Sequence, residues 1–109
     1  MAGNAPLLDI GVVGPAGDGS VVIQPTGDID LATVDRLRTA ALSALAEYRP
    51  RLLVIDLNGV SFLDLSGVSA LVEIRGRATA AGGRVTLRAP QPIVYRVLEL
   101  TNVLGLFES

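Results

Sequence analysis

The sequence lacks the side chains on which most catalytic sites depend. Its 109 residues include no cysteine and no histidine, and all nine basic residues are arginine. Thiolate nucleophiles, imidazole acid–base groups, lysine Schiff bases and the lysine of a Walker-type phosphate loop are therefore absent. Carboxylates alone are an improbable ligand set for zinc. The composition argues against an enzyme, and we expect no metal and no cofactor.

Aromatic residues are scarce, at 4% of the chain, and the net charge is −2. Protein surfaces that bind nucleic acid usually combine a basic stripe with aromatic stacking platforms, so direct DNA or RNA binding is not expected. No apolar run approaches membrane-spanning length, and residues 1–6 have neither the basic start nor the apolar core of a signal peptide. We therefore expect a cytoplasmic protein without membrane insertion.

The residues that are present favour one compact domain. Half of the chain is hydrophobic and only 18% is charged, a balance typical of a folded globular protein rather than a disordered one. No linker, repeat or low-complexity tract interrupts the sequence. We expect residues 7–109 to form the domain and residues 1–6 to be a flexible N-terminus.

The first half of the chain is expected to form two strands and a helix. The runs 7–13 and 20–24 are rich in β-branched residues, and the turn-forming cluster 14–19 between them predicts a hairpin. Pro25 has no N–H for a strand ladder, so the second strand should end or bulge there. Apolar residues then follow helical spacing until Pro50 stops the helix. Its expected buried face comprises Val34, Leu37, Ala41, Ala44, Leu45 and Tyr48.

The second half alternates strands with helices. The spacing predicts a strand at 52–57 that is covered on both faces, a helix that ends at Gly82-Gly83, and a strand at 84–88. Pro90 and Pro92 open a last helix, and residues 106–107 are a possible final strand. Expected core positions of the two helices are Val68, Leu71, Ile74, Ala78 and Ala81, then Ile93, Val97 and Leu100. This order predicts an α/β fold in which a mixed sheet has helices packed mainly on one face.

Three short motifs occur in a fixed order along the chain. Residues 27–33 read GDIDLAT, residues 54–57 read VIDL, and residues 62–67 read FLDLSG. With the order of the elements, these motifs resemble the STAS domain, specifically the bacterial anti-sigma factor antagonists, from about residue 8 to the C-terminus. The resemblance implies a STAS-type fold and a regulatory role in bacterial transcription or stress response.

The resemblance also implies a mechanism, a cycle of partner switching. Family members bind an anti-sigma factor that is also a serine kinase and thereby free the sigma factor; phosphorylation of one serine releases the antagonist, and a serine phosphatase restores it. Ser66 matches the phosphoacceptor, Asp64 the acid two residues before it, and Asp30 the acid of the earlier loop. The chain departs from the family at Leu65, where a hydroxyl residue is usual, and at Asn102, where glycine is common.

The expected partner surface combines the 27–33 loop, the 61–66 loop and the exposed face of the following helix. Its residues are Asp28, Asp30, Thr33, Phe62, Asp64, Leu65, Ser66, Gly67 and Ser69. The surface is acidic and suits an arginine-bearing partner. We expect a monomer or a weak dimer.

The residues alone leave other interpretations open. Asp64 and Ser66 can be an ordinary helix cap, since both residue types dominate helix starts. Phe62 is either exposed or part of the core, and Ser61 is a competing hydroxyl. Arg75 and Arg77 either bind an anion or are simply solvated on the helix surface. The alternative function is a STAS subunit of a stress-signalling scaffold or of a transporter-associated complex.

Overall fold

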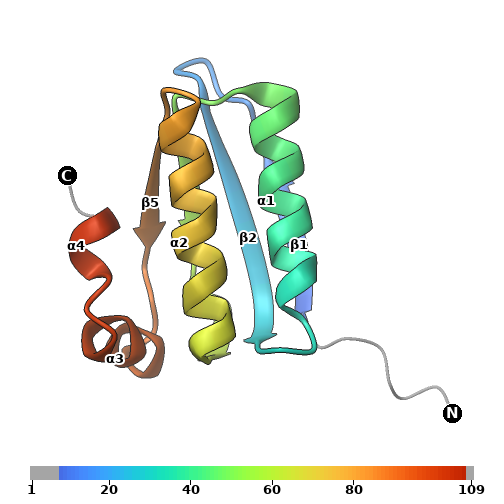
Figure 1. The fold of residues 1–109 in the computed structure, drawn as a ribbon. Coiled ribbons are helices and arrows are strands. Elements are labelled where there is room, and N and C mark those ends of the chain that lie inside the picture. The colour runs from blue at the N-terminus through green and yellow to red at the C-terminus, as the bar shows by residue number, and fades with distance from the viewer. Residues whose placement is uncertain (1–7, 108–109) are drawn as a thin grey trace, which may run out of the picture.

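The computed structural model describes residues 8–107, so the expectation for residues 1–6 lies outside the described residues. The elements in chain order are β1 (Leu8–Val13), β2 (Ser20–Ile29), α1 (Val34–Tyr48), β3 (Leu52–Asp56), β4 (Val60–Leu63), α2 (Leu65–Ala80), β5 (Arg84–Arg88), α3 (Pro92–Leu100) and α4 (Leu104–Phe107). Figure 1 shows α1 and α2 side by side against one face of the sheet, with α3 and α4 beyond β5. The predicted α/β architecture is confirmed.

The sheet is mixed and has five strands in the order β1-β2-β3-β5, with β4 also paired to β2. β1 runs antiparallel to β2, while β3, β4 and β5 extend the sheet through parallel pairing. β2 is long enough to hold two partners in succession. Its first part pairs with β3 over Ser20–Ile23, and its end pairs with β4 over Gly27–Ile29.

Pro25 does not end the second strand, contrary to the expectation from sequence. It lies between Ile23, the last residue paired with β3, and Gly27, the first residue paired with β4. The missing N–H of Pro25 therefore falls where β2 passes from one partner strand to the other, and the loss of a ladder donor is tolerated. The irregularity occurs slightly later, as a register shift between Gly27 and Asp28.

The core lies between the sheet and helices α1 and α2. Its fully buried members include Val21, Ile23, Ile29, Leu37, Ala41, Leu53, Ile55, Ala70, Leu71 and Ile74. The predicted helical faces are largely confirmed, but Tyr48 in the last turn of α1 is exposed, and Ala81 is exposed beyond the end of α2. Gly82 takes the left-handed conformation expected after α2, with φ +86°.

The C-terminal third differs most from the expectation. Val94 and Leu98 face the core from α3, whereas Ile93 and Leu100 are 58% and 70% exposed. The apolar residues of this helix satisfy two overlapping faces, and the observed face is rotated by one residue from the predicted one. The possible strand at 106–107 is instead the end of helix α4. Asn102 between the helices has φ 62°, so asparagine holds the left-handed position as predicted.

Two further observations complete the fold. β4 was not expected from the sequence, which predicted a loop at 61–66.

Within residues 8–107, no helix combines the length and the apolar character needed to cross a bilayer.

Candidate functional site

The candidate site lies where three segments meet at the end of the sheet that holds the carboxyl ends of β2 and β4. They are the end of β2, the loop of residues 30–33 that leads into α1, and the turn from β4 into α2. Because β2 and β4 are parallel, their carboxyl ends lie at the same end of the sheet. The backbone N–H of Asp64 donates to the carbonyl oxygen of Ile29 across 3.2 Å and joins the two strand ends.

Asp64 organises the start of α2. Its Oδ1 accepts the backbone N–H groups of Ser66 and Gly67 at 2.9 and 3.1 Å, which confirms the predicted N-terminal cap. The same oxygen accepts the Ser66 hydroxyl, with 2.5 Å between Oγ and Oδ1. Ser66 is therefore held against a carboxylate at a helix N-terminus, as the sequence suggested.

These hydrogen bonds favour the ionised form of Asp64. The Ser66 hydroxyl is the largest cause that lowers the pKa of this carboxyl; partial burial opposes it, and the N–H groups of Gly67, Ser66 and Leu31 lower the pKa further. Asp64, like an ordinary aspartate, is ionised near neutral pH, and its lowered pKa keeps it ionised in more acidic solution. The N–H of Leu31, in the loop before α1, is thus one of the groups that favour the ionised carboxylate.

Gly67 allows the start of α2 to lie close to the ends of β2 and β4. A Cβ at this position would lie 2.4 Å from Cδ1 of Leu63 and 2.8 Å from Cγ2 of Ile29. Both distances are too short for unstrained contact, so a larger residue would push the start of α2 away from the ends of β2 and β4. Gly67 is buried, and its contribution is to packing.

Asp30 organises the neighbouring loop rather than contacting Ser66 through a hydrogen bond. Its Oδ1 accepts the backbone N–H groups of Ala32 and Thr33 at 3.0 and 3.1 Å. The Thr33 hydroxyl donates to the carbonyl oxygen of Asp28 at 2.7 Å and accepts the Asp30 N–H at 3.0 Å. Thr33 is buried, so it stabilises the loop from within. The result is a fixed turn with Leu31 at its tip.

Asp28 belongs to a separate network. Its Oδ1 accepts the hydroxyl of Ser61 at 2.8 Å, so the competing hydroxyl is engaged across the β2–β4 pair. Asp28 and Asp30 bond to different partners, an arrangement that does not resemble a catalytic carboxylate pair. Phe62, paired with Asp28 in the sheet, is 44% exposed, whereas Leu63 is buried.

Two large apolar side chains are exposed in the segments that form the site, one in the loop before α1 and one at the start of α2. Leu31 and Leu65 are 81% and 68% exposed. Ser69 is exposed one turn after Leu65, on the same face of α2. Sequence reasoning included Leu65, Phe62 and Ser69 but missed Leu31. The sequence did contain a signal for Leu31, because this apolar residue belongs neither to the strand pattern before it nor to the helical pattern after it.

The mixed five-stranded sheet with α1 and α2 on one face matches the fold of STAS proteins. The family model for the STAS domain matches residues 13–109, and the chain belongs to this family. The chain is 27% identical over 84 residues to an anti-sigma F factor antagonist from Lysinibacillus sphaericus, a match that covers 77% of this chain and 72% of that protein.

Solved structures show the same fold. An anti-sigma factor antagonist from Mycobacterium paratuberculosis superposes with a TM-score of 0.80 at 29% identity, covering 92% of this chain and 82% of that one. SpoIIAA in its unphosphorylated form gives a TM-score of 0.77 at 22% identity, with 90% and 84% coverage. The phosphorylated form of Bacillus SpoIIAA gives 0.70 at 23% identity, with 91% and 87% coverage.

Proposed function

We propose that this protein is an anti-sigma factor antagonist: it binds a kinase-type anti-sigma factor, releases the sigma factor, and is switched off by phosphorylation of Ser66. The observation that carries the proposal is the position of the Ser66 hydroxyl, held by Asp64 beside the exposed side chains of Leu31 and Leu65. Membership of the STAS family and similarity to anti-sigma factor antagonists support it.

The surface around Ser66 has the composition of a binding site. Exposed apolar side chains supply area that becomes buried in a complex, and the removal of this area from water favours binding. Asp28, Asp30 and Asp64 add negative charge beside the leucines. A partner that fits has apolar pockets for Leu31 and Leu65, with arginine at the rim.

Phosphorylation would change this surface by local charge and bulk. A phosphoserine carries about −1.5 to −2 charges at neutral pH, and it would stand beside the ionised carboxylate of Asp64. An interface formed around a small neutral hydroxyl cannot desolvate that anion without a large cost. The fold tolerates the change, because the helix N-terminus stabilises negative charge by about 0.3–1 kcal/mol.

The remaining parts of the proposal follow from the same cycle. The protein acts by binding rather than by catalysis, in keeping with a sequence without histidine, cysteine or lysine. A serine phosphatase removes the phosphate from Ser66 and restores binding. The cycle operates in the bacterial cytoplasm, where the sigma factor, its kinase and ATP meet.

Phosphate mapping tests the proposal. The purified protein is mixed with each kinase-type anti-sigma factor of the same bacterium and ATP, and the modified residue is identified by mass spectrometry. We expect one kinase to label Ser66, no labelling of Ser66→Ala, and normal labelling of the control Ser43→Ala, at an exposed position on α1 outside the expected partner surface. Labelling of Ser61 or Ser69 with Ser66 untouched, or no labelling by any of these kinases, contradicts the proposal.

A further inference from the structure

Helix α3 exposes an apolar stripe that the fold does not bury. Ile93, Val97 and Leu100 follow the helical spacing i, i+4 and i+7, which is why the sequence predicted them as core. The structure instead buries the neighbouring face of the helix through Val94 and Leu98. Ile93 stays 58% exposed and Leu100 70% exposed, with Val97 half-buried between them. Two overlapping apolar faces thus lie on one short helix, and only one of them packs against the protein.

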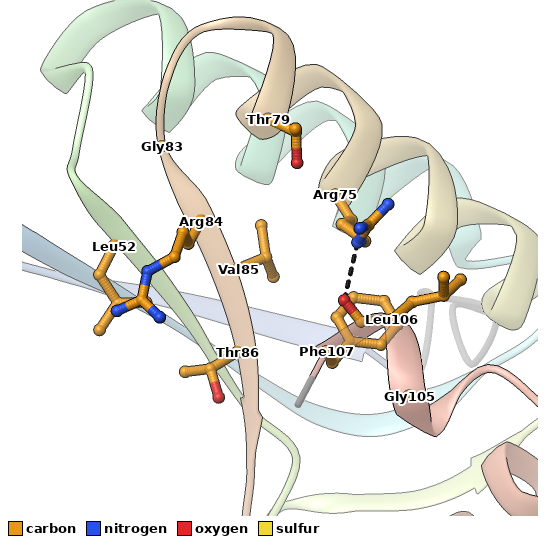
Figure 2. Close-up of a pocket in the computed structure, with 10 residues that line it drawn as sticks. All are labelled: Leu52, Arg75, Thr79, Gly83, Arg84, Val85, Thr86, Gly105, Leu106 and Phe107. Carbon is orange, nitrogen blue, oxygen red and sulfur yellow. Dashed lines mark hydrogen bonds between the residues drawn. The ribbon is translucent and has the colours of Figure 1, made fainter. Parts of the chain in front are cut away.

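The segment that follows α3 packs elsewhere. Figure 2 shows the end of α4 beside α2 and β5, where the Nε of Arg75 donates to the carbonyl oxygen of Leu106 at 2.7 Å. Phe107 is buried there. These residues line a groove of about 410 Å³, and neither Ile93 nor Leu100 belongs to its lining. The stripe on α3 is therefore a separate surface of the protein.

Two residues of opposite charge stand between the apolar ends of this stripe. Arg96 and Glu99 are both exposed. Arg96 follows Ile93 by three residues and precedes Leu100 by four, so it lies next to both on the helix surface. In the part of the chain that the structure describes, neither charged side chain forms an ion pair or a hydrogen bond. Both charges are therefore available to a partner.

We propose that α3 binds α3 of a second copy of this chain, as an antiparallel helix pair related by a two-fold axis. With the axis midway between residues 96 and 97, Ile93 of each copy lies opposite Leu100 of the other. The position opposite Glu99 is then two residues from Arg96, about 3 Å along the helix, so each arginine reaches the glutamate of the other copy.

The order of these residues selects a second copy as the occupant. A two-fold interface brings one surface against itself, so each contact must have both of its halves on that surface. The stripe meets this requirement twice, with an apolar residue at each end and one charge of each sign between them. An unrelated helix would need the same pattern in the reverse direction to avoid leaving a charge unpaired.

The dimer should be weak. The stripe spans about two turns of helix, so the contact is smaller than the roughly 1,200 Å² that stable interfaces bury. We expect a Kd of about 0.1–1 mM for self-association. The protein is then monomeric at micromolar concentration, and the inference does not rest on the function proposed for Ser66. Its test contains no anti-sigma factor, so either proposal can fail alone.

Self-association of the full chain tests the proposal. Sedimentation equilibrium should show the average mass rising from monomer toward dimer between about 20 μM and 2 mM, and NMR at the same concentrations should show amide shifts concentrated in α3. Ile93→Ala and Leu100→Ala should each weaken self-association by about fivefold or more, because the apolar contact occurs twice in the dimer. Leu31→Ala, at an exposed position outside α3, is the control and should associate like wild type.

Two charge variants test the antiparallel pairing. Arg96→Glu and Glu99→Arg each bring like charges together across the axis, and each alone should self-associate at least about fivefold more weakly. In a mixture of the two, every charge meets an opposite one, so association should return to about the wild-type level. Arg77→Glu makes the same change in net charge at an exposed position on α2; it should associate like wild type and should not rescue Glu99→Arg.

The amide spectrum of each variant reports whether the fold is retained. The proposal is overturned by a monomer at about 2 mM, by shifts that spare α3, or by unchanged association of Leu100→Ala. It is equally overturned if the mixture of Arg96→Glu and Glu99→Arg associates no better than either variant alone, or if Arg77→Glu rescues Glu99→Arg as well as Arg96→Glu does.

Discussion

The hydroxyl of Ser66 and the carboxylate of Asp64 are joined by a hydrogen bond of 2.5 Å, on the same oxygen that caps α2. The proposed phosphoacceptor thus shares its acceptor with the backbone amides of the helix start. Loss of the hydroxyl leaves the cap in place, because the two N–H bonds to Asp64 remain. Changes at Ser66 and changes at Asp64 should therefore have different effects on stability.

Asp64→Ala should destabilise the protein by about 1 kcal/mol, the usual cost of losing an N-terminal cap. The midpoint of thermal unfolding would fall by about 4–8 °C for a domain of this size. Asp64→Asn is the matched control, since asparagine caps helices as well as aspartate does and should retain most of the stability. Equal losses in both variants would show that capping is not the main contribution of Asp64.

The charge of Asp64 should appear in the pH dependence of unfolding. Its pKa is lowered in the folded state, first by the Ser66 hydroxyl, so ionisation stabilises the fold above the unfolded-state pKa of about 3.9. That stabilisation is lost as the pH falls through the lower folded-state pKa. The stability difference between wild type and Asp64→Asn, measured by urea unfolding, should be constant from pH 7 to about pH 5 and shrink at lower pH. A difference that grows on acidification would contradict this assignment.

Two glycines of α2 should respond to alanine in opposite directions. Gly67→Ala places a Cβ 2.4 Å from Leu63 and should destabilise by about 1–3 kcal/mol through overpacking. Gly76 lies in the same helix, and a Cβ there would meet nothing within 4 Å. Gly76→Ala should therefore stabilise the fold by about 0.5–1 kcal/mol. Thermal unfolding of both variants checks the pair. A stabilised Gly67→Ala would mean that the α2 start can move outward at little cost.

Leu31→Ala and Leu65→Ala should weaken binding of the anti-sigma factor without affecting the fold. Both side chains are mostly exposed, so truncation removes little from the core. Each truncation should cost about 1–2 kcal/mol of binding free energy, because the leucine would no longer bury its apolar area in the complex. Leu100→Ala is the control, because Leu100 is equally exposed on α3. Calorimetric titration measures the effect. Unchanged affinity in both loop variants, or a comparable loss in Leu100→Ala, would place the interface elsewhere.

Long periodic segments could be predicted from the sequence, and short ones could not. α1 has apolar residues in one helical register, and its limits at Val34 and Tyr48 match the predicted helix. β5 was predicted at its observed bounds because polar residues alternate there with Val85 and Leu87. α3 is short and apolar at adjacent positions, so two faces fit the pattern, and only packing against β4 selects Val94 and Leu98.

The candidate site was only partly predictable for a similar reason. The cap by Asp64 is a local interaction, and the sequence indicated it correctly. The approach of Leu31 to Asp64 depends on the pairing of β2 with β4, a strand of four residues that carries no clear pattern. The strand end expected at Pro25 does not occur, because a proline is tolerated where β2 changes from one partner strand to the other.

The affinity of the anti-sigma factor for wild type, Ser66→Ala and Ser66→Asp tests the central claim most directly. Calorimetric titration should show Ser66→Ala binding within a few-fold of wild type and Ser66→Asp binding about 100-fold more weakly, equivalent to about 2.8 kcal/mol. Circular dichroism and the unfolding midpoint of Ser66→Asp should remain close to those of wild type, since Asp64 still caps α2. Equal affinity of the two variants, or an unfolded Ser66→Asp, would contradict a switch that acts through local charge at Ser66.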